Sequence, residues 1–367
     1  MRDIGGLLTG VVQEIDAPGA ALAIAAEGEV REFAAGIANI DTGVEMTPDT
    51  LFPIASITKV FTATLVMQLV DEGRVDLDRP VRDYLPDFRV ADEAATRTVT
   101  IRQLLTHTSG IDGDKEDAFG RGDDALARYV ADCATLGQTH PPGATFSYCN
   151  SGFNILGHLV AVLRNQTWDD AIGERVFEPL GMQHSGTLPE HVIWRRLAAG
   201  HQRGDDGRPE LLPVWEAERA HGPAGGVVSS ARQLLDFAAA FMSSGNAGLL
   251  SAASMRAMTS PQVTLPNPHD DETHQGLGWA LARYPGQPGP RSGRRSRSWW
   301  PVSRSTDSAR RWPRRRASGF AASRHPACRR PVQPPTSSTT APRTCCGCAT
   351  CPSRSRPGPG PSHRSAK

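Results

Sequence analysis

The spacing of apolar residues predicts helices over much of the first 285 positions. The clearest pattern begins at Thr58, and Gly73 is placed to end it. Its apolar stripe consists of Val60, Leu65, Val66, Leu69 and Val70. Similar patterns predict helices at 7–15, 123–132, 153–163 and 231–242, and Thr100 with Gln103 forms a capping box for a short helix.

Two other stretches have the composition of strands. Residues 19–38 predict a hairpin, with ALAIAA and VREFAAGIA joined by a turn at Glu27-Gly28. Residues 275–283 predict the beginning of another strand, and 223–228 reads as a strand or a tight turn. Such strands need partners from elsewhere in the chain.

The pattern of apolar residues ends near Pro285-Gly286. The last 82 residues contain no Leu, Ile, Met or Glu, but 17 Arg, 13 Pro and 14 Ser. Their net charge is +17, whereas the first 285 residues carry −16. A segment of this composition cannot bury enough apolar surface to offset its conformational entropy. We therefore expect 286–367 to be a disordered basic tail.

The remaining composition excludes several classes of protein. No apolar run is long enough to span a membrane, and the first residues lack the features of a signal peptide, so we expect a cytoplasmic protein. Only Cys133 and Cys149 fall in the first 285 residues, which gives no disulfide framework. The histidines lack metal-ligand spacing, so we expect no metal and no cofactor. The oligomeric state stays open.

Ser56 and Lys59 stand three apart where the helix after Thr58 begins. That spacing places them on one helix face, and a serine beside a lysine is a possible activated nucleophile. Only three of the 40 basic residues are lysine, and an arginine in place of Lys59 could not accept a proton. The alternative is a helix cap beside a solvated side chain, because a Ser-x-x-Lys arises by chance in about one such chain in five.

Tyr148-Cys149-Asn150 is the second informative triplet. A tyrosine near an ammonium group is pushed toward phenolate and can act as a base. The Asn150 amide could bind a substrate amide and the lysine together. The alternative is a buried tyrosine beside a turn asparagine.

With these two motifs, the chain resembles the serine β-lactamase and penicillin-recognising family, most closely the class C β-lactamase-related hydrolases and esterases. The resemblance covers most of residues 19–285 in the order expected for the family. The matching segments are DTLFPIASITKVFTATLVMQLVDEGRVDLDRPVRDYLPDF, TIRQLLTHTSGI, PPGATFSYCNSGFNILG, VFEPLGMQHSG, PAGGVVSSARQLLDF and GLGW.

The resemblance implies an α+β fold, in which an antiparallel sheet flanked by helices carries an all-helical subdomain. It divides the domain 1–285 into a sheet part at about 1–58 and 225–285 and a helical part at about 59–224. It implies that Ser56 is the acylated nucleophile, Lys59 its proton partner, Tyr148 the base and Asn150 a substrate-binding residue. The order in which Lys59 and Tyr148 accept the proton stays open.

Several other residues are interpreted as structural and not as catalytic. We interpret His107 as structural, Cys149 as a small residue that fits its position, and Trp279 as packing. Gly225-Gly226 is expected to allow close approach of the backbone.

One motif of the family is missing. Lys-Thr-Gly or His-x-Gly should follow GLGW on a strand that supplies an oxyanion donor, but PGQPGPRSGRRSRSWW stands there. The residues after 285 are rich in Arg, Pro and Ser, which GC-rich coding DNA yields when it is read out of frame. This composition suggests a reading-frame change near 285. We therefore expect impaired hydrolysis, since loss of one oxyanion donor costs about 10²–10³ in rate.

Three substrate classes fit these motifs equally: β-lactams, D-alanine peptides and small esters. The alternative to an enzyme is an inactive member of the family or a binding protein, whose basic tail contacts nucleic acid or anionic surfaces. The motifs favour the enzyme over nucleic-acid binding.

Overall fold

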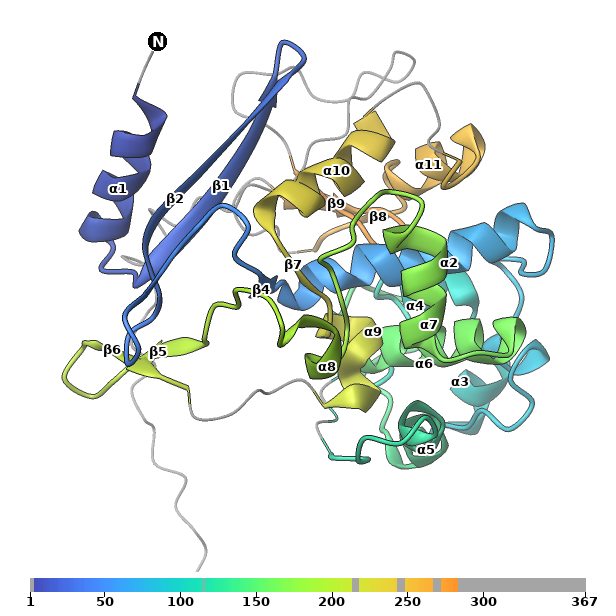
Figure 1. Cartoon of the computed structure of the whole chain (residues 1–367). Helices are drawn as coiled ribbons and strands as arrows, with labels where there is room; N and C mark the ends of the chain where they lie inside the picture. Colours follow the sequence, from blue (N-terminus) through green and yellow to red (C-terminus); the bar gives the residue numbers. More distant parts are fainter. Residues whose placement is uncertain are drawn as a thin grey trace, which may run out of the picture. The chain divides into compact units, whose positions relative to one another are not determined.

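Helix α2 (Thr58–Asp71) runs through the middle of a group of helices (Figure 1). It packs against α6 (Asn150–Arg164), α7 (Trp168–Ile172) and α9 (Gly222–Gly225). Eleven of its 14 residues are buried, so the helix is enclosed on nearly all sides instead of along one stripe. The chain leaves it at Gly73 with φ +68°, as the sequence predicts.

The computed structural model describes residues 3–113, 115, 117–212, 218–242, 248–266 and 272–282, all within the unit Met1–Arg311. The segment 286–367, predicted to be disordered, lies outside the described residues. The same holds for the stretch in which the third family motif was sought. Those two predictions are therefore untested.

The other predicted helices are present, with shifts of a few residues at their starts. Thr100 and Gln103 form the predicted capping box, and α6 begins at Asn150, three residues before the predicted start. The remaining helices are α1 (Ile4–Glu14), α3 (Glu93–Thr98), α4 (Ile101–Leu105), α5 (Ala125–Asp132), α8 (Pro189–Val192), α10 (Ala231–Met242) and α11 (Ala252–Met258). Of these, α3, α8 and α11 were not predicted. Short turns of 3₁₀ or π helix are η1 (Ala55–Ile57), η2 (Val81–Asp83), η3 (Cys133–Thr135), η4 (Gly173–Phe177) and η5 (Arg219–His221).

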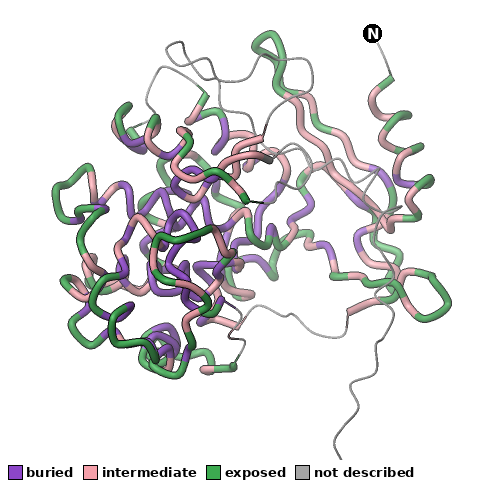
Figure 2. Tube along the Cα trace, turned by 180° about the vertical axis from the view of Figure 1, so that it is seen from behind, coloured by how far each residue is buried: buried purple, intermediate pink, exposed green. Residues whose placement is uncertain are grey.

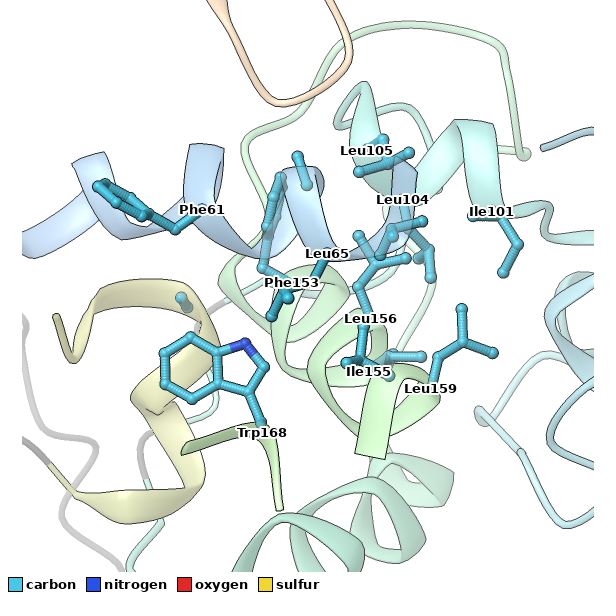
Figure 3. Close-up of a cluster of buried hydrophobic side chains, with 14 of the residues drawn as sticks. Phe61, Leu65, Ile101, Leu104, Leu105, Phe153, Ile155, Leu156, Leu159 and Trp168 are labelled. Carbon is cyan, nitrogen blue, oxygen red and sulfur yellow. The ribbon is translucent and has the colours of Figure 1, made fainter. Parts of the chain in front are cut away.

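The largest hydrophobic core lies between these helices (Figure 3). Leu65 of α2 lies beside Phe153 and Leu156 of α6, and these three side chains and Phe61 of α2 are completely buried. The ring of Phe61 also stacks on Phe237 of α10 at 3.9 Å between centroids. Burial of this kind stabilises a fold by about 1.5–3 kcal/mol for each large side chain. The core therefore fixes α2 and its start.

The strands form small antiparallel sheets, which makes the fold α+β. The predicted hairpin is present as β1 (Gly19–Ala26) paired with β2 (Glu29–Asn39), with the turn at Glu27-Gly28. The sheets have the strand orders β1-β2-β3, β10-β9-β8, β4-β7 and β5-β6. Their other members are β3 (Val44–Glu45), β4 (Phe52–Pro53), β5 (His201–Arg203), β6 (Pro209–Leu211), β7 (Val228–Ser229), β8 (Val263–Thr264), β9 (Glu272–Gln275) and β10 (Ala280–Ala282).

The prediction of one strand beginning in 275–283 is wrong in detail. Strands β9 and β10 pair with each other, and Gly276 to Trp279 form the turn between them. Gly278 has φ +80° there, a conformation that other residues rarely adopt.

The segment 223–228, predicted as a strand or a tight turn, contains the end of α9 followed by the start of β7. Among the described residues, no helix combines the length and the hydropathy required to cross a bilayer.

Candidate active site

Ser56 lies on an exposed turn between a strand and the buried helix α2. Strand β4 pairs with β7, and the N–H of Ile54 donates to the carbonyl of Val227 at 2.9 Å. The chain then turns through Ala55, whose φ is +47°, into η1, which contains Ser56. The serine therefore stands just ahead of α2, close to the helix start that the sequence predicts.

Lys59 lies one turn further on and is buried, with 3% of its surface exposed. Its Nζ donates to Ser56 Oγ at 3.1 Å and to the carbonyl of Ala224 at 2.7 Å. Burial lowers the pKa of Lys59 from 10.5 to about 7, against a smaller opposite effect of Cys149. A substantial share of the neutral amine is therefore present near neutral pH, and it can accept a proton.

Tyr148 reaches the same serine from a segment 92 positions away. Its Oη donates to Ser56 Oγ at 2.7 Å. Lys59 Nζ lies 4.8 Å from the centre of the Tyr148 ring. The structure thus brings Ser56, Lys59 and Tyr148 together, with Ser56 Oγ between the other two polar groups.

Asn150 is the first residue of α6 and is half-buried. Within the described residues, its side chain makes no hydrogen bond with Lys59. Cys149 has a specific structural role, because its Sγ accepts from the N–H of Gly152 at 3.2 Å and caps α6. Interpreting Cys149 only as a small residue missed this cap.

The carbonyl of Ala224 was not predicted as part of the site. Helix α9 is held on α2 by two hydroxyl groups: Thr62 Oγ1 donates to the carbonyl of Pro223 at 2.7 Å, and Thr58 Oγ1 accepts from the N–H of Val227 at 3.0 Å. These bonds place the Ala224 carbonyl over Lys59. The role of a backbone carbonyl cannot be predicted from residue types. The only signal in the sequence was that Ala224 precedes Gly225-Gly226.

The close backbone approach expected at Gly225-Gly226 occurs at the second glycine. A Cβ at Gly226 would stand 2.7 Å from the Cα of Gly222, whereas one at Gly225 would make only an ordinary contact of 3.9 Å with Ala55. Trp279 is buried and packs on the ring of Phe241 at 5.1 Å, as its interpretation predicts.

His107 lies directly behind Tyr148, with the ring centroids 4.4 Å apart. Only 3% of its surface is exposed. The segment that contains His107 was identified in the sequence, but the contact of His107 with Tyr148 was not predicted. Elsewhere in the described ranges, no group of three or more His, Cys, Asp or Glu side chains is arranged to hold a metal ion.

Comparisons with known proteins agree with this geometry. The sequence model of the family described as Beta-lactamase matches residues 6–309. Penicillin-binding protein 4 of Amycolatopsis lactamdurans is 47% identical over 281 residues, which are 74% of this chain and 73% of that protein. The protein flp of Staphylococcus aureus strain MW2 is 32% identical over 190 residues, 50% of this chain and 38% of that protein.

Solved structures with a similar fold include an amidase and a penicillin-binding protein homologue. The D-amino acid amidase of Ochrobactrum anthropi SV3, complexed with L-phenylalanine amide, has a TM-score of 0.66 and 26% identity over 77% of this chain and 83% of that chain. The octameric penicillin-binding protein homologue of Pyrococcus abyssi has a TM-score of 0.64 and 26% identity. That match covers 76% of this chain and 64% of that chain.

Proposed function

The chain belongs to the beta-lactamase family, and from that premise we propose that it is a serine hydrolase that acts through an acyl-enzyme on Ser56. One observation carries the proposal: Ser56 Oγ lies within hydrogen-bond distance of both Lys59 Nζ and Tyr148 Oη. A nucleophile needs a nearby group that can take its proton. Two such groups face the same oxygen here.

Lys59 is the better candidate for the first proton acceptor. In the acylation step, Ser56 Oγ forms a bond to the substrate carbonyl carbon and its proton moves to the neutral Nζ of Lys59. The bond from that carbon to the leaving nitrogen or oxygen then breaks. Tyr148 Oη, 2.7 Å from Ser56 Oγ, is placed to give a proton to the leaving group. Water then attacks the acyl carbon and gives a proton to Tyr148 Oη, the bond from that carbon to Ser56 Oγ breaks, and Lys59 returns a proton to Ser56 Oγ.

The proposed substrates are amides or esters whose carbonyl can reach an exposed serine. Penicillin-binding protein 4 and the D-amino acid amidase are the relatives whose names bear on substrate class. We propose a β-lactam, a peptide or amide of a D-amino acid, or a small ester. In this proposal, Asn150 binds the substrate amide from the first turn of α6.

We propose that hydrolysis by this chain is weak. The sequence after GLGW contains neither Lys-Thr-Gly nor His-x-Gly, the motifs that the resemblance links to one oxyanion donor. Loss of one such donor lowers the rate by about 10²–10³. The expected activity is therefore covalent labelling with weak hydrolysis.

Labelling of Ser56 tests the proposal. Purified full-length protein is incubated with a fluorescent penicillin or a fluorescent fluorophosphonate, and the label is mapped by peptide mass spectrometry. We expect one adduct, on Ser56, and none in Ser56→Ala. Absence of an adduct with both probes, in protein shown to be folded by circular dichroism, would refute the proposal. Hydrolysis of nitrocefin at the full rate of a β-lactamase would refute the predicted impairment alone.

A further inference from the structure

His107 occupies an unusual position at the end of α4. Its φ is +57°, in the left-handed region, which costs most residues energy but is more accessible to His, Asn and Asp. Because of this conformation, the backbone turns just after Thr106, and both the carbonyl and the ring of His107 contact the segment 146–149. A strained residue persists where its surroundings determine its conformation.

Two acceptors of His107 hold the backbone on either side of Tyr148. The carbonyl of His107 accepts from the N–H of Ser147 at 2.8 Å. Its Nδ1 accepts from the N–H of Cys149 at 3.0 Å, in a bond buried from solvent. The residues immediately before and after Tyr148 are therefore both tied to one residue of a different segment.

The ring of His107 also supports the face of the tyrosine. The two rings are nearly parallel, with an angle of 27° between them. Phe146 and Phe153 contact the imidazole at 5.6 and 5.1 Å between centroids, so the imidazole itself has little room to move. Tyr148 is 45% exposed, and Lys59 Nζ lies 4.8 Å from the centre of its ring. The stacked ring of His107 is therefore one of the contacts that hold the phenol in place.

The bond from Cys149 requires a neutral imidazole. A protonated Nδ1 could not accept it, so the ring proton is on Nε2. Burial and the nearby Lys59 lower the pKa of His107 to about 3, which keeps the imidazole neutral over the pH range in which Lys59 changes its charge. His107 is therefore a constant support rather than a proton carrier.

We propose that His107 is a positioning residue for Tyr148: its two acceptors and its ring hold the phenol Oη against Ser56 Oγ. The proposal rests on the function proposed for Ser56 and Tyr148. It assigns to His107 an effect on rate that the interpretation as a purely structural residue does not include. A displacement of a catalytic group by about 1 Å can lower a rate by about 10²-fold.

Two substitutions separate the acceptor from the ring. His107→Asn keeps an acceptor near the position of Nδ1 and tolerates the positive φ, but it removes the ring. His107→Phe keeps a ring and leaves the N–H of Cys149 buried without its acceptor. His158→Asn is the matched control, because His158 is a half-buried histidine of α6 and makes no described contact with Ser56, Lys59 or Tyr148.

The measurement is the rate constant for labelling of Ser56 by a fluorescent penicillin, whose leaving nitrogen takes its proton from Tyr148 in the proposed mechanism, together with the fraction of molecules that become labelled. We expect His107→Phe to lower the rate constant by about 10–100-fold, His107→Asn to recover part of it, and His158→Asn to leave it unchanged. A purely structural His107 would lower the labelled fraction and leave the rate constant of the remaining molecules unchanged. That result would overturn the proposal.

A double-mutant cycle with Tyr148→Phe gives an independent check. If His107 acts through Tyr148, His107→Phe lowers the labelling rate much less in the Tyr148→Phe background. Equal losses in both backgrounds would overturn the proposal while leaving Ser56 as the nucleophile.

A further measurement does not depend on activity. Amide hydrogen exchange at Cys149 is expected to be slow in the wild type and His107→Asn, and at least tenfold faster in His107→Phe. Unchanged protection in His107→Phe would also overturn the proposal. Failure of the wild type to label at all would refute the function of Ser56, and exchange at Cys149 would still report the support that His107 provides.

Discussion

The helices around α2 and the sheet β1-β2-β3 bury their residues to very different extents (Figure 2). Most residues of α2 and α6 are buried, whereas no residue of β1 is fully buried and β2 buries only Ala35 and Ala38. The small cluster at the sheet consists of Ala38, Met46 and Ala198. Within the described residues, the two regions therefore differ mainly in the apolar area that each encloses.

The side chains of the candidate site follow the same division. Lys59, Tyr148 and His107 all come from the helical region, and each has contacts that hold it in place. A catalytic group is effective only when its surroundings fix it. The well-packed region therefore supplies the chemistry, and substitutions in the two regions should have different effects.

Replacing the buried lysine should have the largest effect. Lys59→Met removes the proton acceptor, and we expect the rate constant for acylation of Ser56 to fall by about 10²–10⁴. Arg203→Met is the control outside the helical region, since Arg203 on β5 is an exposed partner of Asp16, and it should leave the rate unchanged. Labelling kinetics measure both. Rates for Lys59→Met within threefold of the wild type would remove Lys59 from the mechanism.

A matched pair of phenylalanines tests the packing directly. Phe61 is completely buried in the helical core, whereas Phe33 on β2 is half-buried opposite Leu22. We expect Phe61→Ala to lower the free energy of unfolding by about 3–5 kcal/mol and Phe33→Ala by about 1 kcal/mol. Urea unfolding measures both. Equal losses would contradict the difference in burial.

The pH dependence of acylation reports how fully the helical region desolvates Lys59. Its pKa is lowered to about 7, so the neutral amine predominates above pH 7 and is lost below it. We expect the acylation rate to rise about tenfold per pH unit up to about pH 7 and to level off above it. The rate of labelling between pH 5 and 9 measures this. A rate that keeps rising toward pH 10 would show that Lys59 is not desolvated.

The smallest effect concerns a carboxylate at the end of α2. Asp71 accepts from Ser251 N, Ser251 Oγ and Ser254 Oγ at 2.6–2.7 Å, which ties α11 to α2. Burial acts to raise the pKa of Asp71, but the bonds from Ser251 and Ser254 together lower it. This stabilisation is therefore present above the ordinary range of an aspartate and is lost as the pH falls.

We expect Asp71→Asn to lower the free energy of unfolding at pH 7 by about 1 kcal/mol. Asp16→Asn, which removes an exposed ion pair with Arg203, should change it by less than about 0.5 kcal/mol. Thermal unfolding of the two variants measures the difference. A larger loss in Asp16→Asn would mean that the sheet region depends on its surface charges.

Local features were predictable where a few neighbouring residues determine the backbone. The Glu27-Gly28 turn, the Thr100–Gln103 capping box and the end of α2 at Gly73 are of this kind. The strand predicted in 275–283 begins only at Ala280, because Gly278 adopts a turn that apolar periodicity does not reveal.

By itself, the sequence determined that Ser56 and Lys59 share one side of a helix start, because a spacing of three is a property of the helix alone. Only the tertiary structure decided what surrounds them. Tyr148 is 92 positions from Ser56 and Ala224 is 165 positions from Lys59. Packing of α6 and α9 against α2 closes these distances, and the same packing removes Lys59 from water and changes its pKa. Desolvation and proximity arise from the enclosed core, which no local pattern of residues encodes.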